Sequence, residues 1–157
     1  MDHPLVVAAR ALAPTLAAHT DAHVRDRQLA APVVEALHAG GFLRALLPAA
    51  LDGAAVAPAT YVDVLAALAE GDAATAWVVM TASTSTLLAA YLEPATARAI
   101  WAGPTTPLLA GVFAPGGQAV IDGDHVRLRG RWPYASGCRH ATWVMVGALT
   151  GSPPTHV

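Results

Sequence analysis

Residues 131–138 hold the residue types best suited to binding a flat ligand. They read Arg-Trp-Pro-Tyr-Ala-Ser-Gly-Cys, so two aromatic rings, a hydroxyl and a glycine directly follow a predicted strand. Residues 113–117, Phe-Ala-Pro-Gly-Gly, also follow a predicted strand. Two loops at one end of a sheet can clasp a flat aromatic cofactor through ring contacts and backbone N–H groups. We therefore predict a ligand site where these two loops meet.

The histidines and the single cysteine are weaker candidates, for a metal site and for a reactive thiol. His19 and His23 are spaced i, i+4, which places two zinc ligands on one face of a helix. No third ligand lies nearby in the sequence, so we expect partly exposed helix histidines and no metal site. Cys138 is followed by Arg139 and His140. An ordinary buried or half-buried thiol is the favoured interpretation, and a thiol activated by its basic neighbours is the alternative.

Two other polar patterns each allow two interpretations. The run Ser-Thr-Ser-Thr at residues 83–86 lies inside an apolar helix. Its hydroxyls either bond to carbonyls of the preceding turn or line a polar pocket. Arg127, Arg129 and Arg131 alternate along a predicted strand, which places three cations on one face and apolar groups on the other. A solvated face is favoured for them over a phosphate or inter-domain contact.

Helices are expected to position these groups in the first two-thirds of the chain. Periodicity, proline and glycine predict helices over residues 5–23, 33–39, 58–70, 73–92 and 94–103. Pro14 should kink or split the first helix, and Asp72 can cap the fourth. One stripe of the fourth helix is predicted to belong to the core; it comprises Trp77, Met80, Thr84, Leu87 and Tyr91.

The hydrophobic period then changes to that of strands. Strands are predicted over residues 108–113, 118–121, 125–132 and 142–149, with a loop at residues 114–117. Asp122-Gly123-Asp124 is typical of a hairpin turn. Helices followed by strands predict an α+β fold. Because open sheet edges promote aggregation, we expect something to complete this sheet, most simply chain beyond Val157.

Composition argues against a nucleic-acid-binding, disulfide-stabilised, secreted or membrane-spanning protein. Apolar residues make up 55% of the chain, charged residues 13%, and the net charge is −2, so no broad basic surface for nucleic acid is expected. One cysteine excludes an internal disulfide framework, and the N-terminus lacks the basic region of a secretory signal. A cytoplasmic location is therefore expected. Residues 73–92 are long enough to span a membrane, but their hydroxyl groups and the lack of Lys or Arg close by favour a buried helix.

Several stretches together resemble the acyl-CoA dehydrogenase superfamily, and they occur in the order found there. They are residues 32–37 with 41–42, 72–78, 110–117 and 130–138. The closer resemblance is to the flavin-dependent monooxygenase branch, the two-component hydroxylases of aromatic and polyketide substrates. True acyl-CoA dehydrogenases have Thr-Glu-Pro-Gly where this chain has Phe-Ala-Pro-Gly at residues 113–116. They also have Trp-Ile-Thr where it has Pro-Tyr-Ala at residues 133–135. Both departures favour the monooxygenase branch.

The resemblance implies a domain organisation. Residues 1–106 would form an all-α N-terminal domain, and residues 107–157 would begin an antiparallel middle β-domain. A C-terminal four-helix bundle, absent from this sequence, would carry much of a tetramer interface and usually a catalytic acid or base. The chain would therefore be inactive alone and part of a homo-oligomer when complete.

The resemblance also implies roles for individual residues. Ser136 would bond near flavin N5, where it would restrain the loss of hydrogen peroxide from a flavin C4a-hydroperoxide. The other residues implied to contact the flavin are Phe113, Ala114, Pro115, Trp132 and Gly137. Those implied to face the substrate are Tyr91, Thr84 and Ser85.

The function implied is hydroxylation of an aromatic or polyketide-like molecule, with reduced FMN or FAD delivered by a separate flavin reductase. One alternative is an acyl-CoA dehydrogenase, which would hold FAD tightly and oxidise a thioester. Another is a truncated chain without catalysis that acts as an interaction module. Tight FAD and reduction by acyl-CoA would indicate the first alternative, and failure to bind flavin with any partner would indicate the second.

Overall fold

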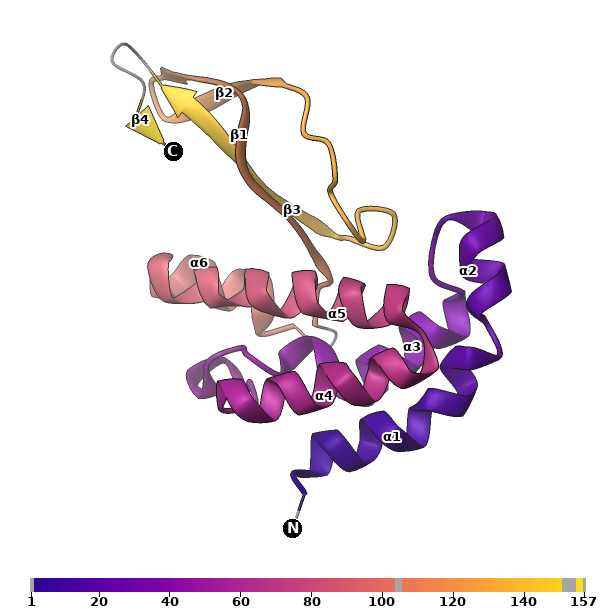
Figure 1. The fold of residues 1–157 in the computed structure, drawn as a ribbon. Helices are drawn as coiled ribbons and strands as arrows, with labels where there is room; N and C mark the ends of the chain where they lie inside the picture. Colours follow the sequence, from indigo (N-terminus) through magenta and orange to yellow (C-terminus); the bar gives the residue numbers. More distant parts are fainter. Residues whose placement is uncertain (1, 104–105, 151–154, 157) are drawn as a thin grey trace.

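The computed structural model describes residues 2–103, 106–150 and 155–156, and it places a β-sheet on one side of a helical layer (Figure 1). The α-helices are α1 (Pro4–Ala17), α2 (Thr20–Asp26), α3 (Ala31–Ala39), α4 (Pro58–Gly71), α5 (Ala73–Ser85) and α6 (Pro94–Trp101). Three 3₁₀ helices are η1 (Phe42–Arg44), η2 (Ala49–Leu51) and η3 (Thr86–Tyr91). The strands are β1 (Leu109–Asp122), β2 (His125–Gly130), β3 (Trp143–Thr150) and β4 (Thr155–His156). The predicted α+β class is confirmed.

Proline and aspartate set the starts of most helices, as the sequence indicates. Pro32, Pro58 and Pro94 each lie in the first turn of their helix, where the missing N–H costs nothing. The first predicted helix is divided into α1 and α2, but the break comes at residues 18–19 rather than at Pro14, which lies inside α1. The fourth predicted helix is shorter than expected, because the chain tightens from α5 into η3 at Thr86.

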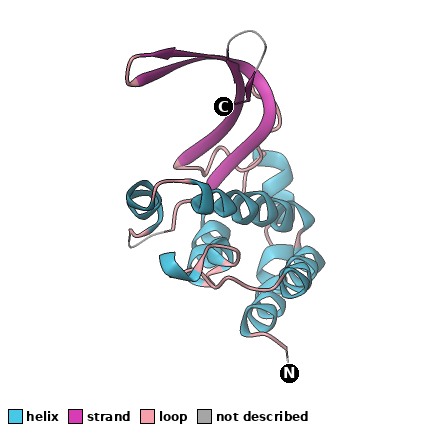
Figure 2. Cartoon of the chain, turned by 90° about the vertical axis from the view of Figure 1, so that its left-hand side faces the viewer, coloured by secondary structure: helices cyan, strands magenta, loops and turns pink. Residues whose placement is uncertain are grey.

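Helix α5 lies between the other helices and the sheet (Figures 1 and 2). Its buried face, which includes Ala76, Val79 and Ala82, joins the main core. Its close approach to β1 depends on Gly111, where an added Cβ would lie 2.6 Å from Oγ of Ser85. The helix therefore forms the floor on which the sheet rests.

The stripe of α5 predicted to be core instead faces away from it. Trp77 is 56% exposed, and Leu87 and Tyr91 in the same stripe are also exposed. The prediction was wrong because helical periodicity identifies a shared face but not which of two apolar faces meets the core. Trp77 and Tyr91 are therefore available to line a site, whereas Leu87 lines a pocket with Tyr61 and Val62 of α4.

The hydroxyl run at residues 83–86 is explained by backbone bonding. Thr84, Ser85 and Thr86 donate to carbonyl oxygens three or four residues earlier, at 2.7–2.8 Å. Ser83 donates to the carbonyl of Phe42 at 2.9 Å. The first of the two interpretations, hydrogen bonding within the helix, is therefore confirmed for most of the run.

The segment Ala73–Tyr91 is also long and apolar enough to cross a membrane by length and composition. Only 44% of its most apolar window is buried, but the segment packs against α4, η1 and β1 as a central helix of the fold. Core helices of soluble proteins commonly pass the same test, and this packing matches the predicted buried helix.

The sheet has the strand order β2-β1-β3-β4. The predicted hairpin is confirmed, because β1 and β2 pair antiparallel around Gly123, whose φ of 59° suits glycine. Strand β3 pairs with β1 in parallel, a direction that strand periodicity does not encode. The loop predicted at residues 114–117 was wrong: this segment continues β1, with register shifts on either side of Pro115.

Strand β2 is exposed along both faces. Arg127 donates to Asp122 at 2.9 Å, and the other strand arginines are solvated, as the favoured interpretation predicts. The apolar groups on the opposite face are exposed as well, with Val126 at 51% and Leu128 at 48%. Alternation predicts two different faces but does not show which of them a neighbouring layer covers.

A glycine at the end of α4 tests the packing of α4 against α1. A Cβ added at Gly71 would overlap the backbone carbonyl of Ala13. We expect Gly71→Ala to lower the free energy of unfolding by about 1–3 kcal/mol, since backbone cannot move aside cheaply. Glu70→Ala, at the exposed neighbouring position, should change it by less than about 0.5 kcal/mol. Equal urea midpoints for the two variants would contradict this close contact.

The cap of α5 should make stability depend on pH. Burial alone would raise the pKa of Asp72, but hydrogen bonds from Thr75 and His23 outweigh it and lower the pKa. A lowered pKa stabilises the fold above about pH 4, and the gain is lost as the pH falls through the folded-state pKa. Asp72→Asn should therefore destabilise the protein in urea at about pH 7, and its difference from wild type should shrink as the pH falls below about 4. A difference that does not change with pH would contradict this.

Candidate functional site

Two cavities lie at the two ends of the α5–η3 segment, and together they hold four of the predicted site residues, Ser136, Gly137, Phe113 and Tyr91. The first, of about 410 Å³, lies between the N-terminal part of α5, the link from α2 to α3, and residues 135–140. The second, of about 720 Å³, lies between η3, α6 and strands β1 and β3. We call them the loop cavity and the sheet cavity.

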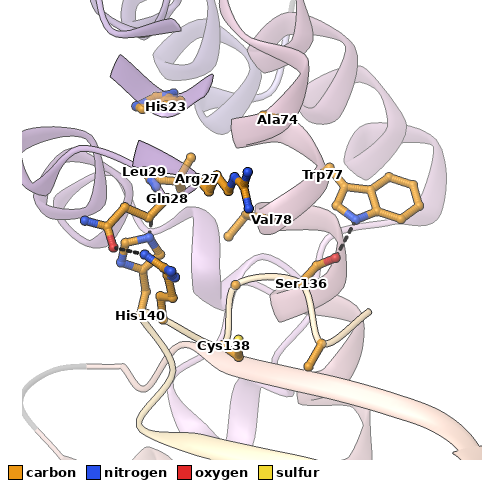
Figure 3. A pocket seen from close by; sticks show the side chains of 13 residues that line it. His23, Arg27, Gln28, Leu29, Ala74, Trp77, Val78, Ser136, Cys138 and His140 are labelled. Carbon is orange, nitrogen blue, oxygen red and sulfur yellow. Dashed lines mark hydrogen bonds between the residues drawn. The ribbon is translucent and has the colours of Figure 1, made fainter. Parts of the chain in front are cut away.

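The loop cavity is shaped by a tight turn around Ser136 (Figure 3). The N–H of Ser136 donates to the carbonyl of Tyr134 at 2.8 Å, and the N–H of His140 donates to that of Gly137 at 2.9 Å. Gly137 has a φ of 79°, and Tyr134 has a φ of 62°, which is unusual for a residue with a side chain. The turn thereby presents the Ser136 hydroxyl toward α5.

One side-chain hydrogen bond joins this turn to α5. Trp77 Nε1 donates to Oγ of Ser136 at 3.0 Å, across 59 residues of sequence. Because the indole can only donate, the hydroxyl must accept from it. The Ser136 proton therefore remains available to a bound group. Sequence analysis assigned Trp77 to the core and missed this contact.

The same loop is tied to the link between α2 and α3. His140 Nε2 accepts from the N–H of Leu29 at 3.0 Å, and Arg139 donates to Gln28 at 3.4 Å. Burial lowers the pKa of His140, and nearby His23 and Arg139 lower it further. His140 is therefore a neutral acceptor here. Cys138 lines the cavity as an exposed thiol, so the expected burial of this residue was wrong.

A buried pair, His23 and Asp72, lies at one side of the loop cavity; His23 lines it and Asp72 does not. His23 Nδ1 is 3.0 Å from Asp72 Oδ2, and both side chains are at most 5% exposed. Asp72 also accepts from the N–H of Thr75 at 2.8 Å and from its hydroxyl at 2.6 Å. His23 is thus a buried residue, contrary to the expected partly exposed histidine. Within the described residues, no group of three or more His, Cys, Asp or Glu side chains is arranged to hold a metal ion.

The sheet cavity is apolar and aromatic. Phe113, Tyr91 and Trp143 line it, together with aliphatic residues of η3, α6 and β3. Their rings are 50–85% exposed. Thr84 and Ser85, predicted to face substrate beside Tyr91, instead donate to Met80 and Thr81 carbonyls and are not among the residues lining either cavity.

The structure thus divides the predicted flavin contacts. Ser136 and Gly137 line the loop cavity, whereas Phe113 lines the sheet cavity. Ala114 and Pro115 are exposed at the irregular part of β1.

Trp132 is not among the residues that line either cavity. A Cβ added at Gly116 or Gly117 would come within 2.7 Å of its ring, so these glycines make room for the indole. Its Nε1 donates to the carbonyl of Gly147 at 2.6 Å. Trp132 therefore braces the base of the hairpin against β3.

This chain is similar in sequence to known proteins over most of its length. No protein-family model matches it. It is 29% identical over 123 residues to indole-3-acetate monooxygenase of Pseudomonas putida, covering 78% of this chain and 31% of the relative. It is 32% identical over 124 residues to the oxygenase component of an FADH(2)-dependent resorcinol hydroxylase from a Rhizobium species. That match covers 78% of this chain and 30% of the relative.

Solved structures agree with these relatives. XiaF from a Streptomyces species, determined in complex with FADH2 and glycerol, superposes with a TM-score of 0.89 at 27% identity, covering 98% of this chain and 39% of XiaF. The chain thus spans about a third of the length of the curated relatives it matches. The predicted resemblance to the flavin-dependent monooxygenase branch of the acyl-CoA dehydrogenase superfamily is thus confirmed, and the chain is similar to the N-terminal portion of those relatives.

Proposed function

We propose that this chain is the N-terminal part of a flavin-dependent monooxygenase that hydroxylates an aromatic or polyketide-like molecule. The observation that carries the proposal is the Ser136 hydroxyl, held by Trp77 at the wall of a cavity with its own proton free. The monooxygenase relatives support it, since they align over most of the chain. Reduced FMN or FAD, supplied by a separate reductase, is the proposed cofactor.

The residues around Ser136 fit a flavin. A flat ring system needs aromatic or apolar surface for its faces and hydrogen-bond groups at its edge. Trp77 offers a ring that is 56% exposed at the wall of the loop cavity, and Ser136 offers the edge group. A bound reduced flavin would supply the activation of O₂. Ser136 would then donate its proton to the ring edge and hold the N5 position.

The sheet cavity is the proposed place for the substrate. Its volume of about 720 Å³ is within the range of pockets for small organic ligands, roughly 300–1,000 Å³. Phe113 and Trp143 would contact a flat substrate through their rings, which suits an aromatic or polyketide-like molecule. The lining contains few polar groups, so these rings would provide most of the binding energy.

The setting of this activity follows from the same proposal. We infer two domains with a boundary near residues 106–107, and a homo-oligomer, proposed as a tetramer, formed by the complete protein. We also infer a soluble cytoplasmic enzyme.

The test uses the full-length protein: loosely held flavin and dependence on a reductase with NADH support the monooxygenase. Tightly bound FAD that is reduced by an acyl-CoA would instead establish the dehydrogenase alternative.

Removal of the Ser136 hydroxyl should uncouple oxygen consumption from hydroxylation. In the full-length enzyme, Ser136→Ala should raise hydrogen peroxide release per product by about tenfold, since one hydrogen bond at a reacting centre is lost. Trp77→Phe should act in the same direction but less strongly, because it frees the hydroxyl without removing it. Ser136→Thr keeps a hydroxyl and should retain most of the coupling. Unchanged peroxide yield in Ser136→Ala would remove this residue from the site.

Truncation of a ring in the sheet cavity should weaken substrate binding alone. Phe113→Ala is expected to raise the KM for the aromatic substrate by about tenfold, because it removes a large apolar contact of roughly 1–2 kcal/mol. The rate at which reduced flavin reacts with O₂ should stay unchanged. Ile121→Ala, a truncation of an equally exposed apolar residue near the hairpin turn, serves as the matched control. A change in the oxygen reaction with no change in KM would place Phe113 beside the flavin instead.

A further inference from the structure

We propose that the loop cavity contains an oxyanion site, built on the His23–Asp72 pair and two arginines, that binds the carboxylate or phosphate group of a ligand. The site shares the Ser136 loop with the proposed flavin site. It rests on different residues, however, and it can be tested without flavin.

The orientation of His23 is fixed by Asp72. Burial opposes ionisation of Asp72, but its hydrogen bonds lower the pKa, so this side chain is a carboxylate near neutral pH. A carboxylate only accepts, and therefore the proton shared with His23 lies on Nδ1 of the imidazole. The opposite ring nitrogen, Nε2, is left to face another group.

The free nitrogen of His23 is an unusual feature of a folded interior. Only 5% of His23 is exposed, and its Nε2 has no hydrogen-bond partner among the described residues. Buried polar atoms nearly always have a partner, so one without is a candidate for a ligand contact. His23 lines the loop cavity, which gives that partner a place (Figure 3).

The charges around the loop cavity determine the kind of group it would bind. Arg27 and Arg139 line it, and in the described part of the chain its lining residues include no Asp or Glu. Ala74, in the first turn of α5, also lines it, so the positive end of the helix dipole lies at the wall. Asp72 lies behind His23 and not in the lining. Guanidinium groups and an imidazolium N–H together suit an oxyanion.

The source of the oxyanion is a ligand carboxylate or a phosphate, and both present the same oxygens to these donors. Binding would place a proton on Nε2 of His23, taken from solvent or from the acid form of the ligand. The imidazolium would then donate to the bound oxygen.

The test uses the 157-residue chain without flavin and three probes: benzoate, benzamide of nearly the same shape but neutral, and inorganic phosphate. Imidazole ¹⁵N spectra of the chain report whether Nε2 of His23 gains a proton. We expect benzoate to convert Nε2 to the protonated form at millimolar concentration and benzamide to have no effect. Conversion by phosphate but not by benzoate would also support the oxyanion site and would identify phosphate as its source.

Variants separate charge recognition from folding. Arg139→Gln should weaken benzoate binding by about tenfold, which corresponds to one charge-assisted hydrogen bond. Arg129→Gln removes the same charge from an exposed position on β2 and should leave binding unchanged. His23→Gln removes the ring, and if it fails to fold, Arg27→Gln at the exposed end of α2 provides the second test. Equal binding of benzamide and benzoate, or no change at His23 with either anion, would overturn the proposal.

Discussion

The hydrogen bond from Trp77 Nε1 to Ser136 Oγ is the interaction on which the proposed site depends. It joins the central helix to a loop that has no regular structure of its own. Other hydrogen bonds hold each partner in place. The Asp72 side chain caps the start of α5, and backbone hydrogen bonds to the carbonyls of Tyr134 and Gly137 shape the loop. A hydroxyl held in this way has a fixed oxygen position and one proton left to donate, which is the kind of arrangement that preorganised catalysis requires.

The α5–η3 segment organises the two cavities. Its first turns border the polar loop cavity, and its 3₁₀ end borders the apolar sheet cavity. The tightening at Thr86 turns Tyr91 toward the sheet, while the hydroxyls before it stay bonded to the helix. One continuous segment therefore separates a site with charges and a fixed hydroxyl from a site with aromatic rings.

Much of the helical part could be predicted from the sequence because its signals are local. Proline in the first turn and the side chain of Asp72 act within one turn of the helix they start. Local signals failed at residues 115–117, where Pro-Gly-Gly suggested a loop. An irregular strand is found there instead, because the segment pairs with β3, which lies far along the chain. The direction of β3 and the exposure of β2 depend on such distant partners too.

The candidate site shows the same limit. Ser136 could be selected from its loop, but Trp77 lies 59 residues away and was assigned to the core. His23 and Asp72, 49 residues apart, carried signals only for a helix face and a cap. The spacing between loops could not show that Phe113 and Ser136 line different cavities, because that depends on how β1 crosses α5.

A crystal structure of the full-length protein with reduced FMN or FAD tests the central claim most directly. The account predicts the ring in contact with Trp77, with Oγ of Ser136 at hydrogen-bond distance from N5 and the sheet cavity left for substrate. A flavin ring bound in the sheet cavity against Phe113, with Ser136 still bonded only to Trp77, would contradict it.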